Sequence, residues 1–98
     1  MKMPMKHFVY LKIAGEKYDQ GLAELMEQTM RDVQKELQGF QGYQVLRAAR
    51  NVSDTDSVLI ELTFENQQVQ ELYLAHPLHV AMLQQIKPDL VDKAAFDA

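Results

Sequence analysis

The apolar residues of this chain repeat with two different periods, and the period changes from segment to segment. Between residues 57 and 64 the apolar side chains alternate one by one, which predicts a β-strand with one buried face. Between residues 18 and 38 they recur at three- and four-residue steps, which predicts an amphipathic helix. Each apolar face must be buried against another element, so we expect a layered α+β fold.

Three more strands and a second helix complete the predicted order. The helical pattern of residues 69–86 is interrupted at Pro77, which suits the first turn of a new helix. The resulting order, β-α-β-β-α-β, is typical of a ferredoxin-like fold with a four-stranded antiparallel sheet. The strands that join 57–64 are expected at 7–14, 43–50 and 90–96.

The ends of these elements carry their own signals. We expect Asp19 to cap the first helix and Gly39 to end it. The poor alternation of residues 43–50 predicts an edge strand, and residues 51–56 have the composition of a turn.

Composition excludes several classes of protein. The 98 residues suffice for one domain, 1–98, and the absence of cysteine excludes disulfides, thiolate nucleophiles and Cys-ligated metals. The net charge is -4 and the basic residues are scattered, so we expect no nucleic-acid partner. No apolar stretch is long enough for a signal peptide or a membrane span, so the cytoplasm is the expected location.

One face of the predicted sheet lacks a cover. If both helices pack on one face, the other presents Phe8, Tyr10 and Leu59 to water. An apolar sheet face of this kind marks an association surface, and two copies can bury it by two-fold symmetry. We therefore expect a homodimer through the sheet faces. The alternative is that Lys12, Glu61 and Thr63 interrupt the surface too much for association.

The segment 73–80, Tyr-Leu-Ala-His-Pro-Leu-His-Val, resembles the helix-break motif of the stress-responsive A/B barrel (Dabb) family. Segments 6–9, 60–64, 86–88 and 95–97 resemble, in order, its opening, central and closing pieces. The resemblance implies a dimeric α+β barrel, with the helices outside and a pocket between sheet and helices. It also links the chain to stress-related plant proteins and to a plant polyketide cyclase that works by aldol chemistry.

The same resemblance suggests where chemistry would occur. His7, Tyr73 and His79 match pocket positions of the plant cyclase, with His79 as the base and Tyr73 positioned beside it or the substrate. Two other polar pocket positions of the cyclase fall at Val58 and near Thr29, which makes this pocket less polar. The pocket is therefore expected to be lined by His7, Val9, Val58, Ile60, Tyr73 and His79.

Each of these residues also has a structural interpretation. His79 and Tyr73 are equally explained as hydrogen-bonded polar groups at the border of the core. His76, before Pro77, is expected to cap backbone groups freed by the helix break. His76 and His79 have no identifiable third partner, so we expect no metal site, and we expect no cofactor.

Three functions follow from these features. The first is a dimer that binds a small apolar or aromatic molecule between sheet and helices, as the mixture of apolar faces and a few polar groups favours. The second is an enzyme, either an aldol-type cyclase or a cofactor-free monooxygenase or isomerase, using His79 and Tyr73. The third is a structural, stress-linked oligomer with a filled core.

Overall fold

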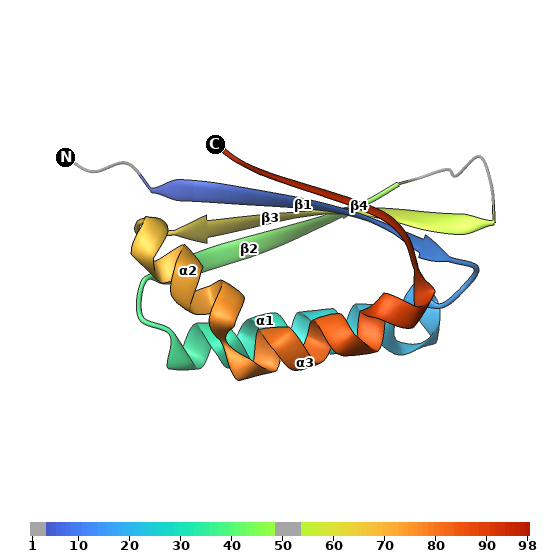
Figure 1. The fold of residues 1–98 in the computed structure, drawn as a ribbon, viewed down its shortest axis with the longest axis horizontal. Coiled ribbons are helices and arrows are strands. Elements are labelled where there is room, and N and C mark those ends of the chain that lie inside the picture. Colours follow the sequence, from blue (N-terminus) through green and yellow to red (C-terminus); the bar gives the residue numbers. More distant parts are fainter. Residues whose placement is uncertain (1–3, 49–53) are drawn as a thin grey trace.

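The computed structural model describes residues 4–48 and 54–98, which form one sheet and a helical layer (Figure 1). The predicted order is confirmed, with the second helix divided in two by Pro77. Residues 51–53 of the predicted turn lie outside the described residues, and Thr55 and Asp56 belong to β3 instead of the turn. In chain order the elements are β1 (Met5–Ala14), η1 (Tyr18–Leu22), α1 (Ala23–Glu36), β2 (Phe40–Arg47), β3 (Thr55–Phe64), α2 (Gln67–Ala75), α3 (Pro77–Ile86), η2 (Lys87–Asp89) and β4 (Leu90–Asp97).

The four strands form an antiparallel sheet in the order β2-β3-β1-β4. β1 is central and pairs with β3 along its whole length, so that His7 faces Leu62, while its other edge pairs His7 with Asp97. β2 lies at one edge, as its poor alternation predicted. All helices lie on one side of the sheet, and β4 returns from the end of α3 to the other edge (Figure 1).

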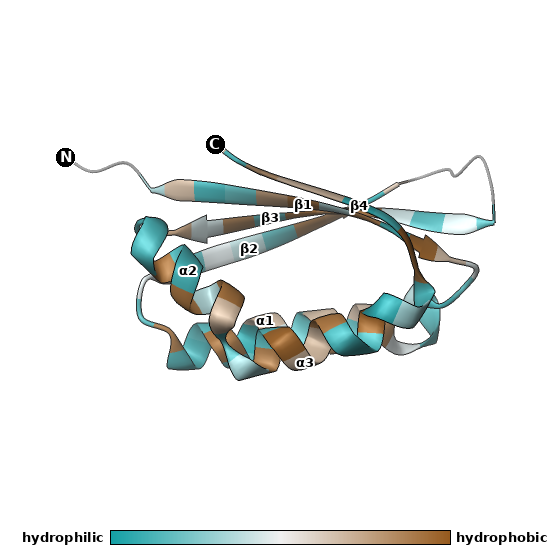
Figure 2. Cartoon of the chain, viewed as in Figure 1, coloured by the Kyte–Doolittle hydropathy of each residue, from teal (hydrophilic) through white to brown (hydrophobic). Residues whose placement is uncertain are grey.

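The core lies between the sheet and the helices. Alternate residues of β3 are buried from Asp56 to Phe64, and hydrophilic and hydrophobic bands follow one another along β1 (Figure 2). α1 and α3 pack side by side beneath this face. The most deeply buried large side chains are Tyr73, Phe64, Ile13, Met30, Leu62, Ile86, Val33 and Val58. Within the described residues, no helix is long and apolar enough to cross a membrane.

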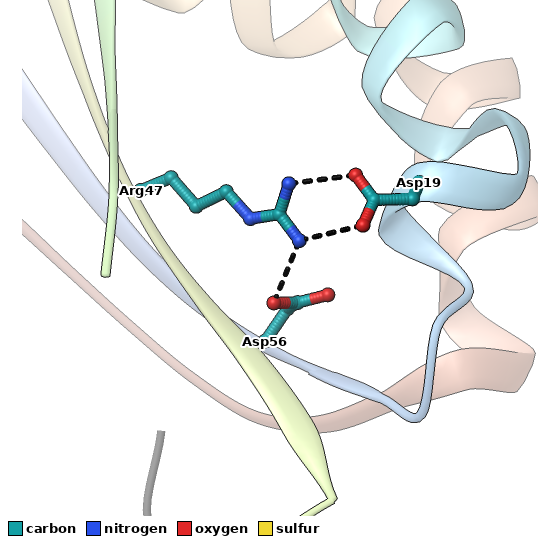
Figure 3. A network of polar contacts seen from close by, with 3 residues as sticks. All are labelled: Asp19, Arg47 and Asp56. Carbon is teal, nitrogen blue, oxygen red and sulfur yellow. Dashed lines mark hydrogen bonds and ion pairs between the residues drawn. The ribbon is translucent and has the colours of Figure 1, made fainter. Parts of the chain in front are cut away.

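The first helix begins differently from the prediction. Its first turn is a π-helix, η1, in which Gly21 has a φ of 138°. Asp19 does not cap a helix, because neither η1 nor α1 has a side-chain hydrogen bond at its N-cap. The Asp19 carboxylate instead binds the guanidinium of Arg47 through two hydrogen bonds of 2.6 and 2.8 Å (Figure 3).

Arg47 connects η1 to the sheet. Its second hydrogen-bond partner is Asp56 at the start of β3, at 2.9 Å (Figure 3). The guanidinium also lies 5.0 Å from the centre of the Tyr18 ring. Hydrogen bonding to Arg47 lowers the pKa of Asp19, and the two carboxylates raise the pKa of Arg47. Planar guanidinium geometry suits this bidentate pair. The cluster fixes the π-helical turn against the ends of β2 and β3.

The turn between α1 and β2 depends on Gly39. Its φ of 97° lies in the left-handed region, and an added Cβ would meet Val69 Cγ2 at 2.7 Å. Gly39→Ala is therefore expected to lower the free energy of unfolding by about 1–3 kcal/mol, through backbone strain and a clash with α2. Urea denaturation measures this difference.

Gly42 provides the matched control for that substitution. Its φ is not positive, and an added Cβ would have no neighbour within 4 Å. Gly42→Ala should leave the free energy of unfolding within about 0.5 kcal/mol of the wild-type value. Equal effects at both positions would contradict the role assigned to Gly39.

Candidate functional site

Tyr73 is a core residue. The α2 helix places its ring among aromatic neighbours, with the Phe64 ring centre 5.2 Å and the Phe40 ring centre 5.6 Å away. Its hydroxyl donates to the Sδ atom of Met30 at 3.6 Å, and only 2% of the residue is exposed. Burial raises the pKa of Tyr73, so its hydroxyl stays protonated and serves as a hydrogen-bond donor.

His79 packs on Tyr73 from the first turn of α3. The two ring centres lie 4.4 Å apart, and the Nδ1 of His79 donates to the carbonyl oxygen of Leu74 at 3.1 Å. Burial is the main cause that lowers the pKa of His79. The ring is therefore neutral at pH 7, with its proton on Nδ1 and a lone pair on Nε2.

His7 belongs to a polar cluster on the helix-facing side. Its Nδ1 donates to the Oδ1 atom of Asp97 at 2.6 Å, since a carboxylate only accepts. The same Asp97 oxygen accepts from the Nε2 of Gln70 at 2.8 Å, and this amide also lies 3.0 Å from the His7 ring nitrogen. Strands β1 and β4 and helix α2 each contribute one residue to this cluster. The carboxylate fixes the orientation of the imidazole.

The two histidines share one chemical property. Neither Nε2 atom forms a hydrogen bond with any of the described residues. Among these residues, every polar side-chain atom that is buried does have a hydrogen-bond partner. Both Nε2 atoms therefore reach solvent. After burial, a positive charge on His7 or His76 also contributes to lowering the pKa of His79. Two oriented imidazoles thus present acceptors at the edge of the core.

His76 and Pro77 occupy the break between α2 and α3. Pro77 is the first residue of α3, and His76 precedes it with an extended backbone. The Nδ1 of His76 accepts a hydrogen bond from the backbone N–H of Leu78 at 3.2 Å. The ring thus satisfies one of the amide groups that a helix start leaves free.

The helices leave the helix-facing side of β4 uncovered. The pairing with β1 turns Lys93, Ala95 and Asp97 toward the helical layer, yet all three are exposed. We call these three residues the β4 surface. Their exposure means that this part of the sheet can be reached from solvent beside His7.

The side of α3 that faces away from α1 is apolar and exposed. Gln85 lines a hollow together with Leu22 and Leu25, so its side of α3 faces α1. At 100° per residue, Val80 and Leu83 point about 140–160° away from Gln85 around the helix axis, and therefore away from α1. Val80 and Leu83 are 41% and 45% exposed. We call these two residues the α3 flank.

The surface hollows lie away from the histidines. One of about 300 Å³ is lined partly by Lys6 and Tyr43, and one of about 270 Å³ partly by Tyr10 and Leu59. The hollow of about 360 Å³ beside Gln85 lies at the opposite end of the helices. None of the three is lined by a histidine. Within 4–48 and 54–98, no group of three His, Asp or Glu side chains could hold a metal ion.

The remaining predicted pocket residues lie behind the histidines. Val58 and Ile60 are core residues with 1% and 3% exposure, and Val9 packs against the core while partly exposed. His7, His79 and Tyr73 are brought together with them on the helix-facing side. Gln70 and Asp97 were missed as site residues. The strand alternation of residues 90–96, continued by one residue, would have placed Asp97 on the same face as Lys93 and Ala95, but its position opposite His7 follows only from the register with β1.

The opposite face of the sheet has no helix over it. Phe8 and Phe96 stack there with ring centres 4.9 Å apart, and Phe96 is 59% exposed. The Tyr10 hydroxyl lies 3.2 Å from the Ser57 Oγ atom. Lys6 and Glu61 form an ion pair on the same face. We call this side of the sheet the open face.

Solved structures of distant proteins share this fold. A dimeric ferredoxin-like protein of unknown function from Bacteroides fragilis is 17% identical, with a TM-score of 0.78 over 97% of this chain and 94% of that chain. A putative antibiotic biosynthesis monooxygenase from Nitrosomonas europaea is 6% identical, with a TM-score of 0.83 over 100% and 90%. SnoaB, a cofactor-independent oxygenase from Streptomyces nogalater, is 12% identical, with a TM-score of 0.76 over 97% and 90%.

At these identities the likeness establishes the fold, a ferredoxin-like α+β architecture, and leaves activity open. No curated protein sequence matches the chain. The model of the Stress responsive A/B Barrel Domain matches residues 5–98. The chain therefore belongs to the stress responsive A/B barrel family, as its sequence resemblance predicted.

The lowered pKa of His79 predicts how stability depends on pH. The unfolded state binds the His79 proton near pH 6.5, whereas the folded state binds it only at lower pH. The contribution of His79 to the free energy of unfolding is therefore fully present above pH 6.5, and it is lost as the pH falls from 6.5 toward the pKa of the folded state. The free energy of unfolding, measured in urea from pH 8 to pH 5, should fall less in His79→Gln than in the wild type.

Nuclear magnetic resonance provides a direct check on the same residue. The ring signals of His79 should titrate with a midpoint below 6.5. A midpoint above that value, or an identical loss of stability in the variant, would contradict the burial of a neutral ring.

Proposed function

We propose that this protein is a homodimer that binds a small, mostly apolar or aromatic molecule on the helix-facing side of its sheet. The observation that carries the proposal is the pair of buried imidazoles, each held through Nδ1 and each with an unpartnered Nε2 atom that reaches solvent. Ligand sites combine apolar walls with a few oriented polar groups. His7 and His79 supply the polar groups.

The β4 surface and the α3 flank supply the accessible walls of the proposed site. Ala95 lies two residues before Asp97 on β4, and Leu83 lies one helical turn after His79 on α3; both offer exposed apolar area, and Val9 pairs with Ala95 across the sheet. Val58, Ile60 and Tyr73 form the inner wall behind them. A bound apolar molecule would remove exposed leucine and valine side chains from water, which is the main favourable contribution to such binding.

The proposed site predicts a specific effect of Asp97. Asp97→Asn removes the carboxylate that orients His7 and should weaken the binding of a ligand by about fivefold, from the loss of about 1 kcal/mol. Ligands can be found by ligand-observed NMR screening of small aromatic and aliphatic compounds, and their Kd values measured by titration.

Asp92→Asn is the matched control for that experiment. Asp92 lies on the same strand, and its partner Lys12 belongs to the opposite face. Its substitution should leave Kd unchanged. A ligand that binds both variants and the wild type equally would contradict a site at His7.

The homodimer is proposed through the open face. Stacked Phe8 and Phe96 and the half-buried Tyr10 and Leu59 give it an apolar centre, and the solved neighbour from Bacteroides fragilis is described as dimeric. Association of two such faces by two-fold symmetry buries the same residues of both copies. This arrangement would leave the β4 surface accessible on the helix-facing side.

Phe96→Glu tests the proposed dimer. A carboxylate at this stacked position would meet its own symmetry copy or an apolar surface, so the variant should be monomeric at micromolar concentration. Native mass spectrometry measures the mass of the assembly. Leu72→Glu is the control, because Leu72 on α2 is exposed to a similar degree, 53% against 59%, away from the open face. A monomeric wild type would contradict the dimer.

A catalytic function is the second candidate, and the 2.6 Å contact between His7 and Asp97 favours it. A carboxylate-oriented imidazole with a free Nε2 atom can remove a proton next to a carbonyl group. His79, the base expected from the resemblance, keeps the same ability, while the Tyr73 hydroxyl is engaged with Met30. Enzymes that could use such a base include aldol-type cyclases and cofactor-free monooxygenases or isomerases. Exchange of such a proton in D₂O, lost in Asp97→Asn with folding intact, would separate an enzyme from a binder.

A structural oligomer is the function that remains if no ligand binds. The filled aromatic cluster around Tyr73 is compatible with it. A role in stress belongs to the same proposal and rests on the family description, while the cytoplasmic location expected from the sequence stays a prediction. Fractionation and expression measurements in the source organism test them.

A further inference from the structure

We infer that the ligand is an elongated amphipathic acid, whose anionic group binds Lys93 and whose opposite end carries a hydrogen-bond donor for His7 and His79. This inference rests on the proposed ligand site and names the chemical class that the site selects. Three features of the helix-facing side carry it: the position of Lys93, the apolar strip beside it, and the acceptor character of both histidines.

Lys93 lies on the same side of the sheet as the histidine site. It pairs with Leu11 on β1, while Asp97 pairs with His7 four residues further along β4. Residues separated by an even number point to the same face of a strand. At about 3.3 Å per residue, the two positions are about 13 Å apart along β4. A single molecule of moderate length can therefore reach both.

The ammonium group of Lys93 is available to a ligand. Lys93 is exposed, and among the described residues its side chain forms neither an ion pair nor a hydrogen bond. The carboxylate of Asp97, by contrast, is already bound by His7 and Gln70. The β4 surface therefore offers one uncompensated positive charge, which favours an anionic group.

The residues between the two polar ends are apolar. Ala95 lies midway between Lys93 and Asp97 on β4, and Val9 and Leu11 are its neighbours on β1. Leu83 of the α3 flank adds exposed apolar area on the helical side. A chain or ring system without polar groups fits this strip, because a polar group there would lose water without gaining a partner.

The histidine end selects a donor and disfavours an anion. Both Nδ1 atoms donate within the protein, so the Nε2 atom of each ring accepts a hydrogen bond when that ring is neutral, as the His79 ring is at pH 7. A hydroxyl group, such as an alcohol or a phenol, supplies the hydrogen that they lack. A carboxylate placed there would face the lone pair of the neutral His79 ring and the negative charge of Asp97. The orientation of the molecule along β4 is therefore fixed, with its acid at Lys93.

Isothermal titration of the full chain with three related probes tests this inference. The probes are 10-hydroxydecanoate, which has both end groups, decanoate, which lacks the hydroxyl, and 1,10-decanediol, which lacks the acid. The wild type should bind 10-hydroxydecanoate most tightly. Lys93→Gln should weaken that binding about fivefold and leave the binding of the diol unchanged, because an exposed ion pair contributes up to about 1 kcal/mol.

Lys35→Gln, on the exposed surface of α1, removes an equal charge far from β4 and should leave every Kd unchanged. Equal binding of the hydroxy acid to wild type and Lys93→Gln would overturn the inference. Lys93 would then be a charged residue that keeps the edge strand β4 from pairing with another chain. If none of the three probes binds while the screened compounds do, the inference fails and the proposed function stands. If neither the three probes nor the screened compounds bind, the inference and the proposed function both fail.

Discussion

The pairing of β1 with two neighbouring strands is the constraint on which the rest of this structure depends. β1 is paired with β3 along its whole length on one edge and with β4 from His7 to Ile13 on the other, so most of its side chains have neighbours on both sides. One set, including Leu11 and Ile13, forms the centre of the core. The same register brings Asp97, 90 residues away in sequence, to His7. Core and candidate site are thus products of one strand alignment.

Much of the fold follows from local sequence patterns, whereas the cluster at the candidate site does not. The alternation of β3, the helical period of α1 and the break at Pro77 each depend on neighbouring residues, and each predicted its element correctly. The contact between His7 and Asp97 depends on the register of two distant strands, which no local pattern specifies. Asp19 illustrates the same limit. Its position near a helix start predicted a cap, but Arg47 from a distant strand competes for the carboxylate and forms two charge-assisted hydrogen bonds with it.

The two faces of the sheet divide the proposed roles. The open face presents stacked aromatic rings and suits a second copy of the chain. The helix-facing side buries most of its area, including the two imidazole rings, but leaves β4 exposed and the two Nε2 atoms in reach of solvent. Binding and catalysis make different demands on those imidazoles. A binder needs only their lone pairs, while a catalyst also needs His7 to hold a proton that Asp97 stabilises.

The exposure of β4 has a consequence for how this scaffold can change over evolutionary time. From Val91 to Asp97 the strand contributes no buried side chain to the core of the single chain. Substitutions at positions 93 and 95 therefore carry little cost in folding free energy, in contrast to those on β3, where every second residue is buried. Selection can alter the chemistry of this strand while the remainder of the fold stays constant. Proteins built on the same architecture can in this way diverge in what they bind without passing through unfolded intermediates.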